Sequence, residues 1–193
     1  LHDESIAPCR AKKIPINIRN TNRPEDAGTI IGPTPEEAKL PITGVAGRKG
    51  FSMIYIEKSM MNSEVGFGAT LLQILAAHDL PFEHCPTGID TMSVVVHTDH
   101  LDPVRQSVMD EISQRLHPDI LKVEDGLAMI AVVGEGMVFS KGTAAGIFQA
   151  ISDAGINIRM IDQGSSELSI IVGVDDKDYE ETIRAIYGAF INQ

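Results

Sequence analysis

The chain has 193 residues, 43% of them hydrophobic and 22% charged, which is ordinary for a globular protein of one large domain or two small ones. Its formal net charge of −11 argues against nucleic acid and against an anionic membrane surface as partners, because both attract clustered Lys and Arg. Two distant cysteines, Cys9 and Cys85, lack metal-binding spacing and predict reduced thiols in the cytoplasm. No apolar run is long enough to span a bilayer, and the chain opens without Met or a signal peptide, so we expect a piece of a longer protein.

The first 40 residues predict little structure of their own. A short helix is expected over residues 5–13 and a strand over 14–19, followed by the turn-rich stretch RNTNRPEDAGT at 19–29 and a linker at 33–41. So short a segment cannot bury a hydrophobic core. We therefore expect residues 1–40 to be the end of a preceding domain together with a linker.

The next part of the chain predicts six elements in the order β-α-β-β-α-β. The expected strands are residues 51–57, 82–87, 91–97 and 120–123, and the expected helices are residues 66–78 and a second one that begins at Asp102-Pro103. Asp is a favoured N-cap residue and Pro a favoured first helical residue. The second helix has a predicted buried stripe of Val104, Val108, Ile112 and Leu116. This order is the ferredoxin-like arrangement, in which two helices cover one sheet face and the other face is open to partners.

The same order of elements recurs at an offset of 76 residues. The stretch FSMIYIE at 51–57 aligns with LAMIAVV at 127–133, and the register holds without a gap to the end of the chain. A repeat in fixed register indicates two copies of one supersecondary unit. The second copy predicts strands at 127–133, 157–163 and 168–174 and helices at 142–154 and 178–190.

The second copy ends at Gln193 without a last strand, which would leave an unpaired sheet edge. Residues 42–48, ITGVAGR, are an otherwise unassigned strand just before the first copy, and we predict that they complete the second sheet. The predicted fold class is α+β, with two ferredoxin-like modules. The first module, residues 49–125, is inserted into the second, which consists of residues 41–48 and 126–193.

Several stretches resemble aspartate kinase, and together they cover essentially the whole chain. The RNT…GT loop at 19–29 is similar to the end of that family's kinase domain, although Asp3 replaces a usual proline upstream. ITGVAGRKG at 42–50 resembles the strand that leads into the regulatory region, and QGSSELSI at 163–170 resembles a signature of its second ACT module. FEHCPTGIDTMSVVV at 82–96 resembles the lysine-sensitive, single-function kinases. The resemblance implies two amino-acid-binding ACT modules, with the kinase's catalytic residues upstream of this chain.

An amino-acid effector requires N–H donors for its carboxylate, which a helix N-terminus supplies, and a carboxylate or carbonyls for its ammonium group. The loop at 61–68 enters a predicted helix with small residues, so its backbone can approach a ligand closely. The resemblance implies that the facing strand adds an acidic residue and that two first modules meet across the site in a homodimer. The candidate effector-binding residues are Met61, Ser63, Glu64, Gly66, Phe67, Gly68, Phe82, Glu83, Thr87 and Gly88.

Structural roles remain open for the same residues. Gly66 and Gly68 also suit a helix entry, Glu83 a solvated strand and Met61 a core position. The loop GEGMVFSKG at 134–142 fails the spacing of a phosphate-binding loop, so no catalytic residue and no metal site is predicted in this chain. For residues 163–167 we favour a structural and interface role over ligand binding.

The resemblance implies feedback inhibition, by lysine or alternatively threonine, of the ATP-dependent phosphorylation of L-aspartate in lysine, threonine and methionine biosynthesis. No cofactor is expected in this chain, with ATP and Mg²⁺ confined to the complete kinase. Two alternatives remain: an amino-acid-sensing ACT pair of another enzyme or regulator, and a purely structural dimerisation module.

Overall fold

A computed structural model describes residues 3–32 and 40–190 of the chain. They belong to two compact units that divide between Lys39 and Leu40, and each unit is described by itself. In the first unit, helix α1 (Asp3–Ala11) is followed by strands β1 (Ile16–Ile18) and β2 (Thr29–Ile31), which pair antiparallel. The predicted helix and first strand are confirmed. Strand β2 was missed because it has only three residues, which lie between Gly28 and Gly32. The predicted linker lies mostly outside the described residues.

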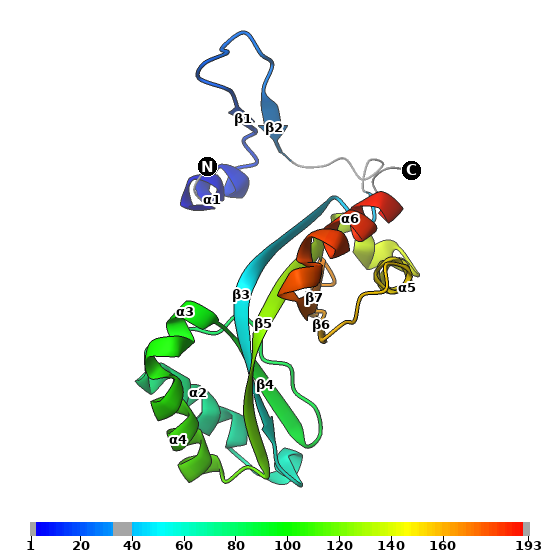
Figure 1. The fold of residues 1–193 in the computed structure, drawn as a ribbon. Coiled ribbons are helices and arrows are strands. Elements are labelled where there is room, and N and C mark those ends of the chain that lie inside the picture. Colours follow the sequence, from blue (N-terminus) through cyan, green and yellow to red (C-terminus); the bar gives the residue numbers. More distant parts are fainter. Residues whose placement is uncertain (1–2, 33–39, 191–193) are drawn as a thin grey trace. The chain divides into compact units, whose positions relative to one another are not determined.

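The described part of the second unit contains an antiparallel sheet of five strands in the order β4-β3-β5-β7-β6. The strands are β3 (Gly44–Glu57), β4 (Thr91–His97), β5 (Ile120–Val133), β6 (Met160–Asp162) and β7 (Ser169–Asp175). The helices are α2 (Phe67–Ala77), α3 (Thr98–Leu101), α4 (Arg105–Leu116), α5 (Thr143–Asp153) and α6 (Tyr179–Phe190). Strands β3 and β5 run from one set of helices to the other (Figure 1).

The two long strands belong to both copies of the repeat. Residues 44–48 of β3 pair with residues 129–133 of β5, and residues 53–57 pair with residues 120–124. The register shifts between these two stretches, where Gly50 and Gly126 have φ angles of 87° and 74°, a region that glycine adopts readily. The pairing of residues 44–48 with the second copy is the one that the sequence predicts.

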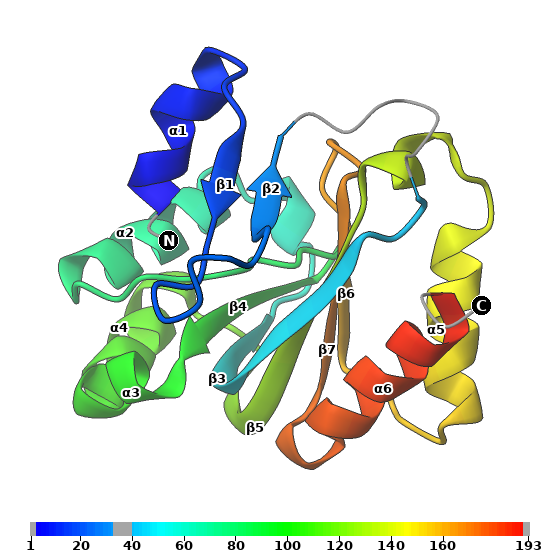
Figure 2. The same cartoon turned by 90° about the horizontal axis from the view of Figure 1, so that it is seen from above.

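Apolar side chains of the second unit form three buried clusters. The first lies between the sheet and helices α2 and α4, with Ile54 and Ile112 fully buried, and the second lies under α5 and α6, with Ile130 and Ile186 fully buried. Seen from above, the strands lie between these two sets of helices (Figure 2). The third cluster is on the opposite sheet face, and consists of Phe51, Met53, Val95, Leu127, Met129 and Met160.

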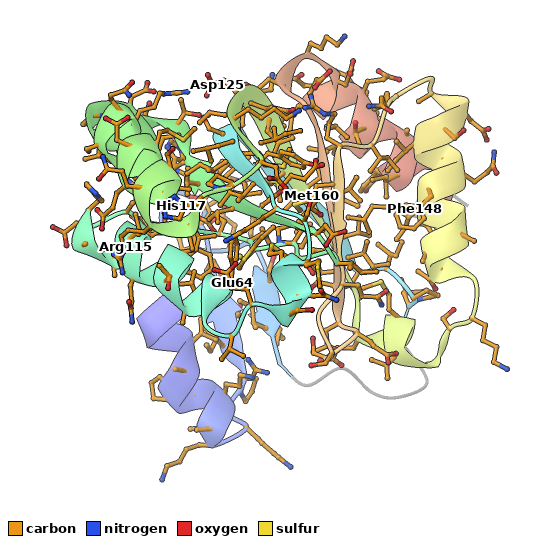
Figure 3. The ribbon with its side chains drawn as sticks, turned by 90° about the horizontal axis from the view of Figure 1, so that it is seen from below. Glu64, Arg115, His117, Asp125, Phe148 and Met160 are labelled. Carbon is orange, nitrogen blue, oxygen red and sulfur yellow. The ribbon has the colours of Figure 1, made fainter. Side chains whose placement is uncertain are left out.

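The third cluster corrects one expectation. The sheet face that we expected to be open to partners is partly buried within this chain, because the two copies place apolar residues of that face against one another. In Figure 3, Met160 lies between α4, which carries Arg115, and α5, which carries Phe148. The long shared strands account for this, since twisted strands turn the two halves of the sheet toward each other.

Two local predictions were wrong. Asp102 does not cap a helix, because helix α3 already begins at Thr98, and Asp102 instead accepts a hydrogen bond from Arg105 at 2.7 Å. Residues 82–87 are not a continuous strand, and only His84 and Thr87 form isolated bridges to β4. Pro81 precedes this segment and Pro86 lies within it, and both lack the N–H group that a strand ladder requires. Strand β6 is also shorter than predicted.

A polar network stands beside the register shift. The Ser52 hydroxyl, which is fully buried, donates to Asp125 at 2.6 Å, and the Arg105 guanidinium donates to the same carboxylate at 2.8 and 3.1 Å. The Arg105 guanidinium first, and the Ser52 hydroxyl second, hold the pKa of Asp125 below its usual value. The network therefore stabilises the fold when Asp125 is ionised.

We expect Asp125→Asn to lower the free energy of unfolding at pH 6 by less than about 1 kcal/mol, because the Asp125 side chain is 53% exposed and solvent screens the pair. Because the pKa of Asp125 is lower in the folded than in the unfolded state, its carboxylate stabilises the fold at pH values above the unfolded-state pKa of about 3.9. This stabilisation is lost as the pH falls through the folded-state pKa. The difference between variant and parent should therefore vanish toward pH 2 in urea unfolding. A difference independent of pH would contradict this.

Candidate functional site

The entrance to helix α2 is hydrogen-bonded to the turn at 88–90. The N–H groups of Lys58 and Asn62 donate to the carbonyl oxygens of Asp90 and Ile89 at 2.9 and 3.2 Å. The N–H of Met60 donates to the Asp90 carboxylate at 2.9 Å. These bonds join the loop before α2 to the two residues that directly follow the predicted segment 82–88.

Gly66 begins helix α2. It is the N-cap residue with φ 89°, and nothing lies within 4 Å of the position that a Cβ would take. The N–H of Thr70 donates to the Gly66 carbonyl at 2.9 Å, so the helix itself provides no carbonyl for the N–H groups of Gly68 and Ala69. A helix N-terminus of this kind can bind a carboxylate.

Two predicted site residues belong to the core. Met61 and Phe67 are each 4% exposed and pack in the first cluster. The N–H of Phe67 donates to the Glu64 carbonyl at 3.3 Å. Their side chains therefore anchor the loop to the first cluster, which agrees with the structural role left open for Met61. The Cβ position of Gly68 lies 3.5 Å from the Met92 side chain, so α2 packs closely on β4 at this point.

The segment 82–88 lies along β4. Thr87 bridges Met92, and the N–H of Gly88 donates to the Thr91 carbonyl at 2.7 Å. Phe82 and Glu83 are exposed, whereas Cys85 packs against the first cluster. Burial raises the pKa of the Cys85 thiol, which keeps the thiol protonated, as expected for a small apolar side chain.

Charged side chains around the loop differ in whether they form an ion pair. Lys58 lies 2.5 Å from the Glu64 carboxylate and donates to the Leu116 carbonyl at 2.7 Å. Glu64 lies on the loop that enters α2 (Figure 3). Within residues 3–32 and 40–190, by contrast, no ion pair involves Glu83. Glu83 is an exposed carboxylate that lines a hollow with Arg48 and His84.

The same segments expose large apolar side chains. Those with more than a third of their area exposed are Met60, Val65, Leu72, Phe82 and Ile89. Val65 is 100% exposed. Exposed apolar side chains gathered around a site are typical of a surface that another protein covers.

The second copy has a counterpart of this site. A hollow of about 460 Å³ lies at the N-terminus of α5, where Gly142 is the N-cap with φ 88°. Its lining residues include Met137, Ser140, Lys141, Thr143, Gln163 and Glu167. Sequence reasoning favoured a structural role for residues 163–167, and the hollow beside them was not foreseen because it depends on how the loop at 134–142 folds back.

Neither a metal cluster nor a membrane span is found in the described residues. Across residues 3–32 and 40–190, no three His, Cys, Asp or Glu side chains are grouped to hold a metal ion. Within the same ranges, no helix has the length and apolar character that a bilayer crossing requires.

Comparison with known proteins agrees with this fold. The family profile described as ACT domain matches residues 130–190. Aspartokinase 3 of Bacillus subtilis is 42% identical over 190 residues, which cover 98% of this chain and 42% of that protein. The crystal structure of Clostridium acetobutylicum aspartate kinase, described as an important allosteric enzyme, has 46% identity and a TM-score of 0.93 and covers 98% of this chain and 44% of that one.

Two more distant structures show the fold alone. Escherichia coli aspartokinase III in complex with lysine and aspartate has 23% identity and a TM-score of 0.79, covering 99% of this chain and 42% of that one. The regulatory subunit of aspartate kinase from Thermus flavus has 22% identity and a TM-score of 0.66, covering 77% of this chain and 97% of that one.

The repeat, the two helix-covered half-sheets and the matched profile define a tandem ACT protein. The match to aspartokinases over nearly the whole chain then places it with the C-terminal regulatory ACT region of that family. The chain spans less than half the length of the aspartokinases from Bacillus and Clostridium that it matches.

Proposed function

We propose that this chain senses an amino-acid end product and conveys feedback inhibition to an attached aspartate kinase. Lysine is the first candidate effector and threonine the second. The observation that supports the proposal is the N-terminus of α2, whose approach loop is hydrogen-bonded to Ile89 and Asp90 at the end of the carboxylate-bearing segment 82–88 in the first module. The relative from Escherichia coli that is described in complex with lysine supports the choice of lysine.

Each group has a role in this proposal. The backbone N–H groups of Gly66 and Gly68 bind the α-carboxylate of the effector, and Glu83 binds an ammonium group. Ser63, Thr87 and Gly88 provide polar edges, and Phe82 covers the apolar stem of a lysine side chain. Lys58 already neutralises Glu64, so Glu64 shapes the loop more than it attracts a cation.

A second copy of the chain completes the site. The apolar side chains exposed around the loop, Val65 above all, are an unfavourable surface for water and a suitable one for a homodimer. Two effector sites would then lie at the dimer interface, each with N–H groups for the carboxylate of the effector and a carboxylate for its ammonium group. Effector binding shifts the populations of two dimer arrangements, which the kinase senses.

The nested division into modules is also part of the proposal. Module 1 comprises residues 49–125, and module 2 comprises residues 41–48 and 126–193, with residues 1–40 as the end of the kinase domain. The register of residues 44–48 on residues 129–133 supports this division. The complete kinase uses ATP and Mg²⁺ to phosphorylate L-aspartate, whereas the present chain binds no cofactor.

Calorimetric titration of the 193-residue chain with lysine and with threonine tests the proposal. We expect saturable binding of one of them, at one site per chain. Absence of binding by both, in a chain shown to be folded, would contradict the sensing function and favour a structural dimerisation module.

The variant Glu83→Gln should weaken lysine binding about tenfold, because it removes the charge from a hydrogen bond to an ammonium group. Glu181→Gln is the matched control, since Glu181 is an exposed carboxylate on α6 whose side chain is 60% exposed. The dissociation constants of the two variants are compared by the same titration. Equal dissociation constants for the two variants would show that Glu83 does not bind the effector.

A further inference from the structure

The segment 82–88 presents side chains in two directions. His84 bridges Val95, which belongs to the third cluster between the two copies, whereas Cys85 packs against the first cluster under α2. Alternation of this kind is the geometry of an extended chain. Cys85 therefore lies on the α2 side of the segment and His84 on the side of the third cluster, where His84 and Glu83 line one hollow of about 290 Å³ with Arg48 and Met129.

His84 reaches the second module. Its Nδ1 atom lies 2.9 Å from the Oδ2 atom of Asp162, the last residue of β6. The two side chains are 22% and 41% exposed, so the contact is partly shielded from solvent. Residues 84 and 162 are 78 positions apart, and the contact joins the proposed sensing module to an edge strand of the other.

The segment is joined to β4 by backbone hydrogen bonds from the N–H groups of Glu83 and Gly88 and to the carbonyl oxygens of His84 and Pro86. It has two isolated bridges to β4 in place of a regular ladder. The β6 strand has three residues and pairs on one side only, with β7. Gln163, which lines the hollow of the second module, follows Asp162 directly. The His84–Asp162 contact therefore connects segment 82–88 directly to the residue that precedes the wall of that hollow.

We propose that the His84–Asp162 contact is a positioning contact that transmits effector occupancy from module 1 to β6 and the adjoining hollow of module 2. The inference rests on the proposed sensing function. It assigns His84 a role that is separate from effector binding, because the His84 Nδ1 atom contacts Asp162 of module 2. Loss of the contact should leave effector affinity unchanged and abolish the response of module 2.

Hydrogen–deuterium exchange of the 193-residue chain measures this response. Exchange is compared without effector, with saturating lysine and, in a second series, with saturating threonine. In the parent chain we expect exchange in residues 160–163 to slow about fivefold or more on binding. In His84→Ala and in Asp162→Asn this slowing should be lost, while the dissociation constant measured by calorimetry changes less than about twofold. Thermal unfolding establishes that each variant is folded.

His78→Ala is the matched control. His78 Nε2 lies 2.9 Å from Glu111 Oε2, and both residues belong to module 1. Its removal should leave the response of residues 160–163 intact. A full response in His84→Ala and Asp162→Asn, or an equal loss in His78→Ala, would overturn the proposal. A parent chain that binds lysine or threonine without any response in residues 160–163 would overturn this inference alone, whereas a parent chain that binds neither would overturn the sensing function itself.

Discussion

Replacing Ile54 or Ile130 by Ala lowers the free energy of unfolding by about 2–5 kcal/mol, the usual range for removing a large buried side chain. Both side chains are fully buried, Ile54 in the cluster of the first module and Ile130 in that of the second. Ile54 is on β3 and Ile130 is on β5, and each strand contributes to both modules. We therefore expect either variant to weaken the whole second unit, which unfolds in one transition.

Urea unfolding followed by far-ultraviolet circular dichroism and by tyrosine fluorescence tests this expectation. Tyr55 reports on the first module, and Tyr179 and Tyr187 report on α6 in the second. Ile161→Ala is the control, because Ile161 is 50% exposed and should change the free energy of unfolding by less than about 0.5 kcal/mol. Two separate transitions, each sensitive to one substitution only, would show that the modules fold independently.

Gly134→Ala should destabilise the second unit by about 1–3 kcal/mol, because the added methyl group has no room. A Cβ at this position would lie 2.0 Å from the Pro41 carbonyl oxygen and 2.9 Å from the Ile42 Cα. These are backbone atoms, so the chain entering β3 must shift. Strain in the backbone of residue 134 is not the cause, since its φ of −179° is extended and open to alanine.

Gly164→Ala is the control for that experiment. Gly164 lies in a loop of the same module, and nothing is within 4 Å of its Cβ position. Its free energy of unfolding should stay within about 0.5 kcal/mol of the parent chain. Chemical denaturation of both variants measures the difference, and a Gly134→Ala variant as stable as Gly164→Ala would show that Pro41 moves away without cost.

The repeat made much of the fold predictable from sequence. The apolar pattern of residues 51–57 and its match to residues 127–133 gave the strands, and the absent last strand of the second copy indicated where residues 42–48 pair. The pattern did not predict the full length of the shared strand. It did not show that residues 44–57 form one strand, because Lys49 and Gly50 interrupt the apolar alternation and a bulge absorbs them.

The effector role of the segments 61–68 and 82–88 stays a prediction. The structure shows that the loop before α2 is hydrogen-bonded to Ile89 and Asp90, which directly follow the segment 82–88. The burial of Met61 and Phe67 was not predictable, since an apolar residue in a glycine-rich loop fits a core as well as a ligand. The contact of His84 with Asp162 had no signal in the sequence, because it depends on how the two modules pack.

The pairing of Arg48 with Met129 has a consequence for how such a chain can be rebuilt. The two residues are cross-strand neighbours, and a two-residue hairpin turn can join positions of this kind. Exchanging residues 49–128 as one block would therefore keep the pairing of residues 44–48 with residues 129–133. It would also uncover Met129 and Met160, so the new block must supply apolar partners in place of those of the third cluster.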